Sequence, residues 1–240
     1  MKKYLNQFGY LDTLNVNNND IFDDELESAI KTYQLNYKLN TTGILDFHTV
    51  SMMMNIRCGV PDIINGTNTM YSGTFDTSKF AFFGNITWAY KFLIYRFEGD
   101  FPTHLMEPIR YAFDIWAKKT QFYFEKSLDE DYYTDLSLAY VPYDHGDGHP
   151  FDGSGDSLAH AFPPPDGRVR FKASEDWTVG SVPRKIDIVS IALHEIGHAL
   201  GLGHTDIPDA IMFPYYYYGK VKRTLHQDDI DGINTLYGWN

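Results

Sequence analysis

Eleven residues near the C-terminal end carry the strongest signal in the chain, and they read His194-Glu195-Ile196-Gly197-His198-Ala199-Leu200-Gly201-Leu202-Gly203-His204. Four residues of an α-helix turn by about 400°, so His194 and His198 are predicted to lie on one helical face, one turn apart. Gly201 and Gly203 favour an end to that helix and a reversal of the chain, which lets His204 reach the same point. Three neutral imidazoles at one point predict a zinc site whose fourth position is open.

Glu195 has the chemistry and the position of a general base. Zinc lowers the pKa of a bound water to around 7. Glu195 points about 100° away from His194, so it is placed to take the proton of that water instead of binding the metal. The alternative is that the histidines are ordinary core or surface residues of a Gly-rich helix. The two glycines and the third histidine favour the catalytic interpretation, and with Met212 eight residues further on they form the metzincin signature.

The single cysteine of the chain lies in a second motif, Arg57-Cys58-Gly59-Val60-Pro61-Asp62. A thiolate is a good zinc ligand, and the Gly and Pro that follow predict a rigid, exposed turn. We expect Cys58 to fill the fourth zinc position and exclude water, while Arg57 and Asp62 pair and hold the turn. The alternative, a buried structural cysteine, would be favoured if the zinc motif were absent.

Composition excludes several classes of protein. The 240 residues allow one large domain or two small ones, and 43% hydrophobic residues exclude a disordered chain. A net charge of −12 gives no general footprint for nucleic acid or anionic lipid. No apolar run approaches the ~18–20 residues of a membrane span. The first eight residues are basic but lack an apolar segment behind them, so we expect no signal peptide in this chain.

Apolar periodicity divides the chain into two regions that differ in predicted secondary structure. Residues 1–62 are predicted to be helical, with helices over 23–37 and 46–54. Residues 63–84 are rich in Gly, Asn, Thr and Ser, which predicts an exposed linker that a protease can cut. The remainder mixes strands with helices and indicates an α/β or α+β domain. Its predicted strands are 86–90, 122–124 and 136–140, and its predicted helices are 103–119, 187–200 and one that follows His226.

At the cysteine and histidine motifs the sequence resembles the matrixins, the matrix metalloproteinases. Their switch motif reads PRCGxPD, and here Ile56 replaces the leading proline. Without a hemopexin-like region, the chain is most similar to plant matrixins. The resemblance implies an α+β fold with a small helical, peptidoglycan-binding-like propeptide over 1–62, a linker or activation segment over 63–84, and a metzincin catalytic domain over 85–240. That domain is expected to have a mixed twisted sheet and three helices.

The resemblance also implies two further metal sites. Three structural-zinc ligands of the family match His145, Asp147 and His160, and the fourth falls on Arg170. The calcium ligands that match are carboxylates or backbone oxygens of Asp152, Gly153, Gly155, Ser157 and Glu175, and the third carboxylate of the family falls on Lys172. A cation cannot serve as such a ligand. We therefore expect the second zinc and the calcium to be lost or weakened, with Arg170 paired to Asp147 and Lys172 paired to Asp152 or Glu175. The alternative is that His149 or water completes the zinc site.

The implied activity is that of a zinc endopeptidase made as a latent proenzyme. Its substrates would be internal peptide bonds of extracellular proteins, and the implied location is extracellular or at the cell surface. A substrate would lie antiparallel to the strand at Leu158-Ala159-His160, and its side chain after the scissile bond would contact Met212, Pro214 and Tyr216. We expect a monomer that a second protease activates and that binds no nucleic acid. The alternative is a pseudoprotease that binds peptides without turnover.

Overall fold

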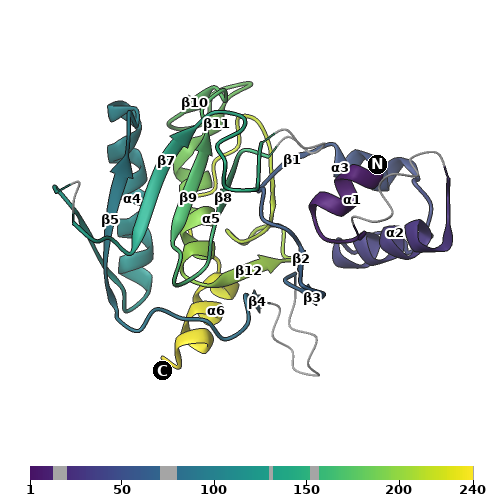
Figure 1. The fold of residues 1–240 in the computed structure, drawn as a ribbon, viewed down its shortest axis with the longest axis horizontal. Helices are drawn as coiled ribbons and strands as arrows, with labels where there is room; N and C mark the ends of the chain where they lie inside the picture. Colours follow the sequence, from purple (N-terminus) through teal and green to yellow (C-terminus); the bar gives the residue numbers. More distant parts are fainter. Residues whose placement is uncertain (13–20, 71–79, 130–131, 152–156, 240) are drawn as a thin grey trace.

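The computed structural model describes residues 1–12, 21–70, 80–129, 132–151 and 157–239 (Figure 1). Its N-terminal part contains three helices, α1 (Lys2–Gln7), α2 (Asp24–Asn36) and α3 (Phe47–Met53). Asp23 and Asp46 cap α2 and α3, because their carboxylates accept the N–H groups of Leu26 and Thr49 at 2.8 Å. Both helices predicted in this region are confirmed.

A five-stranded sheet forms the centre of the second part of the chain. Three of its four strand pairs are parallel, and β8 runs antiparallel to its neighbour at the edge. The mixed sheet that we expected is therefore confirmed. In spatial order the strands are β6 (Tyr123–Lys126), β5 (Phe92–Glu98), β7 (Leu136–Val141), β9 (Arg168–Lys172) and β8 (Ala159–Ala161).

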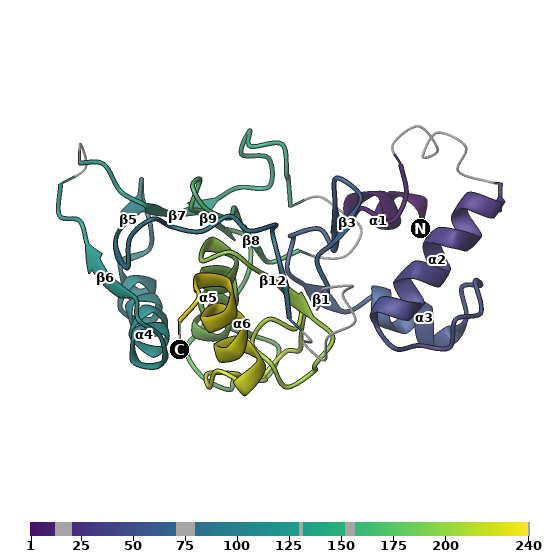
Figure 2. The ribbon, with the colours of Figure 1, turned by 90° about the horizontal axis from the view of Figure 1, so that it is seen from below.

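Three helices accompany this sheet, as expected, and they lie on one of its faces (Figure 2). They are α4 (Thr103–Lys119), α5 (Ile188–Ala199) and α6 (Gln227–Tyr237). α5 is buried along its whole length and packs beside α4, where the indole N–H of Trp116 donates to the carbonyl of Leu193 at 2.9 Å. The histidine-bearing helix is thus the central core element. No helix in the described part is long and apolar enough to span a bilayer.

Short strands join the N-terminal part to the sheet-containing part. β1 (Ile56–Arg57) pairs with β13 (Tyr215–Tyr216), and β4 (Phe80–Phe82) pairs with β12 (Leu202–Thr205). The described part contains two further two-stranded pairs, β2 (Ile63–Ile64) with β3 (Thr67–Asn68) and β10 (Trp177–Thr178) with β11 (Ile186–Asp187).

Two local predictions need correction. Thr69 and Met70 were expected in an exposed linker but are buried, because Thr69 exchanges main-chain hydrogen bonds with Asp62 and His204. The strand expected at 86–90 is absent, and the strand begins instead at Phe92. Trp88 explains the difference: its indole N–H donates to Ala199 O at 2.8 Å and its main-chain N–H donates to the Tyr237 hydroxyl at 3.2 Å. Contacts with the ends of helices therefore hold this segment, in place of a strand ladder.

Candidate metal centre

Helix α5 and strand β12 bring the three predicted histidines together. Asp187 starts α5 by accepting the N–H of Ser190 at 3.0 Å, and the helix presents His194 and His198 one turn apart. Gly201 then adopts a φ of +103°, which a residue with a side chain rarely adopts, and the chain reverses into β12. As a result, His204 Nε2 lies 3.1 Å from His198 Nε2. One donor atom from each histidine and from Cys58 lies within 4.8 Å of all the others.

Each imidazole is oriented through its Nδ1 atom. His194 Nδ1 lies 2.7 Å from Ile211 O, and His198 Nδ1 lies 2.8 Å from Leu202 O. His204 Nδ1 lies 3.0 Å from the carboxylate of Asp62. A proton on Nδ1 leaves the Nε2 lone pair free for a metal. Burial lowers the pKa of all three imidazoles, which favours the neutral form that binds a metal.

Glu195 is a buried carboxyl group beside this cluster. Neither of its oxygens has a hydrogen-bond partner among the described residues. Burial raises its pKa to about 8, against a smaller lowering effect of the Cys58 thiol. Leaving a buried carboxyl group unpaired is costly, and a strongly shifted group of this kind is typical of a functional site.

Cys58 is fully buried in the cluster, so the exposed turn that we expected is wrong. Its Sγ lies 3.4 Å from His198 Nε2. The segment around it is held from both sides, since Cys58 N–H donates to Pro214 O at 2.9 Å and Gly59 N–H donates to Ala159 O at 2.7 Å. In addition, Leu158 N–H donates to Arg57 O at 3.1 Å and Ile56 pairs with Tyr216. Four of the five predicted peptide-binding residues therefore contact residues 56–59.

Met212, the fifth predicted peptide-binding residue, packs against α5. A Cβ atom on Gly197 would lie 2.3 Å from Met212 Sδ, so the helix and this side chain are in close contact. The segment is fixed by Asp229, whose carboxylate accepts the N–H groups of Ile211 at 2.9 Å, Met212 at 3.0 Å and His226 at 2.7 Å. Sequence reasoning missed Asp229, which was visible only as an acidic residue near the start of a helix.

The predicted pair of Arg57 and Asp62 is present and fully buried. Guanidinium and carboxylate meet at 2.6 and 3.0 Å, and the guanidinium carbon lies 3.6 Å from the ring centre of Phe8. Burial raises the pKa of Asp62, but the opposite effect of Arg57 and His204 is larger. The net pKa of Asp62 therefore lies below its usual value. The carboxylate is therefore ionised.

A group of buried tyrosines connects the two parts of the chain, and no sequence signal pointed to it. The hydroxyls of Tyr4 and Tyr33 lie 2.8 and 2.6 Å from the hydroxyl of Tyr215. Tyr215 and Phe213 belong to the hydrophobic cluster formed by the N-terminal helices. The segment after the histidine motif thus completes the core of the N-terminal part.

A second cluster brings together His145, Asp147 and His160, with their donor atoms within 4.8 Å. Asp147 Oδ2 lies 3.0 Å from His145 Nε2 and 2.9 Å from His160 Nε2. Arg170 does not form the ion pair with Asp147 that we expected. Its guanidinium lies 3.3 Å from Glu98 and donates to Ser137 O.

The predicted calcium ligands are only partly described. Ser157 is buried, and its hydroxyl has no partner among the described residues. Glu175 follows β9, where its main-chain N–H donates to Lys172 O at 3.3 Å. Asp152, Gly153 and Gly155 lie outside the described residues.

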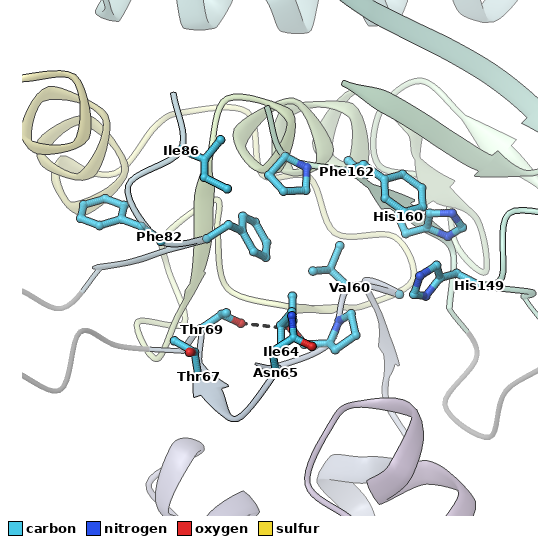
Figure 3. Close-up of a pocket in the computed structure, with 16 residues that line it drawn as sticks. Val60, Ile64, Asn65, Thr67, Thr69, Phe82, Ile86, His149, His160 and Phe162 are labelled. Atoms are coloured by element: carbon cyan, nitrogen blue, oxygen red, sulfur yellow. Dashed lines mark hydrogen bonds between the residues drawn. The ribbon is translucent and has the colours of Figure 1, made fainter. Parts of the chain in front are cut away.

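A cavity of about 440 Å³ lies between the segment that follows Cys58 and the edge of the sheet domain. Figure 3 shows Val60, Ile64 and Thr69 on one side, facing Phe82 and Phe162 on the other. His149 and His160 also line it. The cavity therefore adjoins the second cluster, and its walls come from both parts of the chain.

Comparison with known proteins assigns both parts. Residues 85–238 match the matrixin family model, and residues 1–53 match the model of a putative peptidoglycan binding domain. Metalloendoproteinase 5-MMP of Arabidopsis thaliana is 40% identical over 256 residues, covering 100% of this chain and 71% of the relative. Metalloendoproteinase 1 of Glycine max is 40% identical over 251 residues, covering 100% and 81%. Human matrix metalloproteinase-16 is 34% identical over 250 residues, covering 98% and 40%.

Proposed function

Since the chain belongs to the matrixin family of peptide-bond hydrolases, we propose that it is a zinc endopeptidase that its own N-terminal region keeps latent. The observation that carries the proposal is the convergence of one thiol and three imidazoles, all buried, within 4.8 Å of one another. We further propose that residues 1–62 form the propeptide, 63–84 the activation segment and 85–240 the catalytic domain.

The four side chains that converge here fit a zinc ion. Zinc prefers four ligands at tetrahedral positions, and thiolate and imidazole are its common ligands in proteins. His194 Nε2 is buried and has no hydrogen-bond partner among the described residues, which is expected of an atom reserved for a metal. Each Nδ1 atom has an acceptor, as metal-binding histidines require. We assign the catalytic zinc to His194, His198 and His204, with Cys58 as the fourth ligand of the latent form.

The catalytic roles follow from the positions of the side chains. Zinc bound there would supply a Lewis acid that polarises the peptide carbonyl and lowers the pKa of the attacking water. Glu195 accepts the proton of that water and delivers it to the leaving amine. Leu158, Ala159 and Pro214 offer the main-chain groups that hold an extended peptide across the site, because they now hold residues 57–59 in this way.

Latency follows because residues 57–59 occupy the place where a substrate peptide would lie. The thiol of Cys58 stands where a water would need to approach, and the flanking main chain uses the hydrogen-bonding groups that a substrate needs. Arg57 forms a parallel bridge with Ser157. The segment therefore runs along this edge opposite to the antiparallel substrate implied by the family, so its own peptide bonds are not presented for cleavage.

The broader setting is proposed on the family relationship. We propose that the enzyme acts as a monomer on extracellular proteins, and that a second protease activates it by cutting within the activation segment, residues 63–84.

A combined measurement of zinc content and peptide turnover tests the proposal. The full chain, treated with an organomercurial that captures the thiol, should cleave a quenched fluorescent peptide. Glu195→Ala should retain zinc and lose about 10²–10⁴-fold of this activity, because the proton acceptor is gone. Glu125→Ala, at an exposed position, is the matched control. A zinc-loaded wild type without turnover would favour the pseudoprotease, and full activity of Glu195→Ala would refute the assigned base.

A further inference from the structure

We infer that Asp62 is a positioning residue for His204, the third histidine of the metal centre. The propeptide would then support zinc binding in two ways. Cys58 supplies a ligand, and Asp62 orients another ligand from outside. This inference rests on the proposed zinc site at His194, His198 and His204, and its test separates the two claims.

The three imidazoles are not oriented in the same way. His194 and His198 donate from Nδ1 to main-chain carbonyls of the catalytic part, Ile211 O and Leu202 O. His204 instead donates to Asp62 Oδ1 at 3.0 Å, across 142 positions of sequence. Both side chains are completely buried, so water does not compete for this hydrogen bond. Among the three ligands, His204 alone takes its orientation from the propeptide.

The position of the accepting carboxylate is set by the propeptide core. Arg57 donates to Oδ1 at 2.6 Å and to Oδ2 at 3.0 Å. The hydroxyls of Tyr10 and Tyr37 donate to Oδ2 at 2.7 and 2.8 Å. Tyr37 ends helix α2, and Tyr10 follows α1. Four donors therefore hold the carboxylate against His204, and only one of its two oxygens contacts the imidazole.

The main chain adds a second link to the same histidine. Asp62 O accepts the N–H of Thr69 at 2.7 Å, and Thr69 O accepts the N–H of His204 at 2.7 Å. The ring and the main chain of His204 are thus both held by residues 62–69. A carboxylate that accepts from Nδ1 fixes the tautomer, orients the ring and makes Nε2 a more basic ligand. Removing the propeptide would remove this acceptor, so the latent chain should retain zinc more firmly than the Cys58 ligand alone explains.

The test uses the full chain with Cys58→Ser, so that the sulfur ligand does not contribute. Zinc affinity is measured by competition with a chelating indicator. Adding Asp62→Asn should weaken zinc binding by about 10-fold or more, in the range seen when such supporting partners are removed. The matched control is Tyr33→Phe, which removes a buried propeptide hydroxyl that bonds to Tyr215 and leaves the donors of Asp62 and its bond to His204 in place. The affinity of this control should stay within about twofold.

A second readout is the solvent exchange of the histidine Nδ1–H protons. In the zinc-loaded wild-type chain with ¹⁵N-labelled histidine, the Nδ1–H proton of His204 should be protected from solvent exchange, as those of His194 and His198 should be. In the Asp62→Asn chain only the His204 resonance should shift. An unprotected His204 Nδ1–H, an unchanged zinc affinity of Asp62→Asn, or an equal loss in the tyrosine control would overturn the inference. Failure of the zinc site itself looks different, because His204→Ala would then bind zinc as tightly as its Cys58→Ser parent.

Discussion

At the scale of single residues, one buried carboxylate links the last helix to the metal centre. Asp229 accepts the N–H of Ile211, and Ile211 O in turn accepts from His194 Nδ1. Burial raises the pKa of Asp229, against the lowering effect of the main-chain N–H groups of Ile211, Met212 and His226. The orientation of the first histidine therefore depends on a residue that a metal ion would never touch.

Asp229→Ala should destabilise the protein by about 2–4 kcal/mol, because three main-chain N–H groups lose their acceptor in the core. The measurement is the free energy of unfolding of the full chain in denaturant. Asp231→Ala is the matched control, since Asp231 is exposed and accepts the exposed amide of Gln227 in α6. Equal stability of the two variants would show that the contacts of Asp229 contribute little.

Contacts between residues that lie far apart in the sequence could not be predicted. His194 and His198 were predictable because helical geometry alone places them one turn apart, and the position of Glu195, about 100° from His194, follows from the same geometry. The bond between Asp62 and His204 crosses 142 positions, and the hydroxyl contact between Tyr33 and Tyr215 crosses 182. Neither has a periodicity that marks it. The exposed turn predicted for Cys58 was wrong for the same reason, since the segments that bury it, around Ala159 and Pro214, are distant in the sequence.

At the scale of elements, helix α5 is fixed at its start by a dense set of hydrogen bonds to Asp187. The carboxylate accepts from Gly180 N–H at 2.7 Å, from Ser190 and from the guanidinium of Arg223. Burial raises the pKa of Asp187, but the bonds from Arg223, Gly180 and Ser190 outweigh it, so the net pKa lies below its usual value. A carboxyl group with a lowered pKa in the folded state stabilises that state only while it is ionised.

The stability of wild type relative to Asp187→Asn should therefore depend on pH. At pH 7 wild type should be more stable by about 2 kcal/mol, through the charge-assisted bonds and the helix cap. This advantage should shrink as the pH falls below about 4, the ordinary pKa of an aspartate, towards its lower pKa in the folded state. Unfolding free energies of both chains at pH 7 and pH 3 provide the check. A difference that does not change with pH would mean that the charge of Asp187 is unimportant.

The helices and strands that could be predicted are those with clear apolar periodicity. α2, α4 and the sheet strand at Leu136–Val141 have clear apolar periodicity and appear where the pattern placed them. Residues 86–90 have the composition of a strand, yet Trp88 binds the ends of α5 and α6 and the backbone joins no ladder. Thr69 and Met70 have the composition of a linker, yet they pack into the core. In both cases long-range packing outweighed local preference.

At the scale of the whole molecule, the two clusters of ligands differ in completeness. The first has four donors, whereas His145, Asp147 and His160 provide three, and Arg170, which the family resemblance aligns with the fourth ligand, pairs with Glu98. A structural zinc normally has four protein ligands. The chain should therefore hold close to one zinc tightly, and its melting temperature should respond little to calcium.

Metal analysis after dialysis checks this prediction, with His194→Ala as the comparison. Wild type should retain about one zinc per chain, and His194→Ala should retain far less than one. Two tightly held zinc ions per chain, one of which survives in His194→Ala, would show that the second cluster is a complete site despite Arg170.

We propose that the Cys58 sulfur, supported by the main chain around it, keeps a competent zinc peptidase inactive, and the most direct measurement is the peptide turnover of the intact, uncut Cys58→Ser chain beside intact wild type. A hydroxyl is a much poorer zinc ligand than a thiolate at neutral pH. Cys58→Ser should therefore cleave a quenched fluorescent peptide without any proteolytic cut, whereas untreated wild type should be inactive until an organomercurial captures its thiol. Intact wild type that is as active as Cys58→Ser, with both chains confirmed uncut, would show that Cys58 does not keep the enzyme latent.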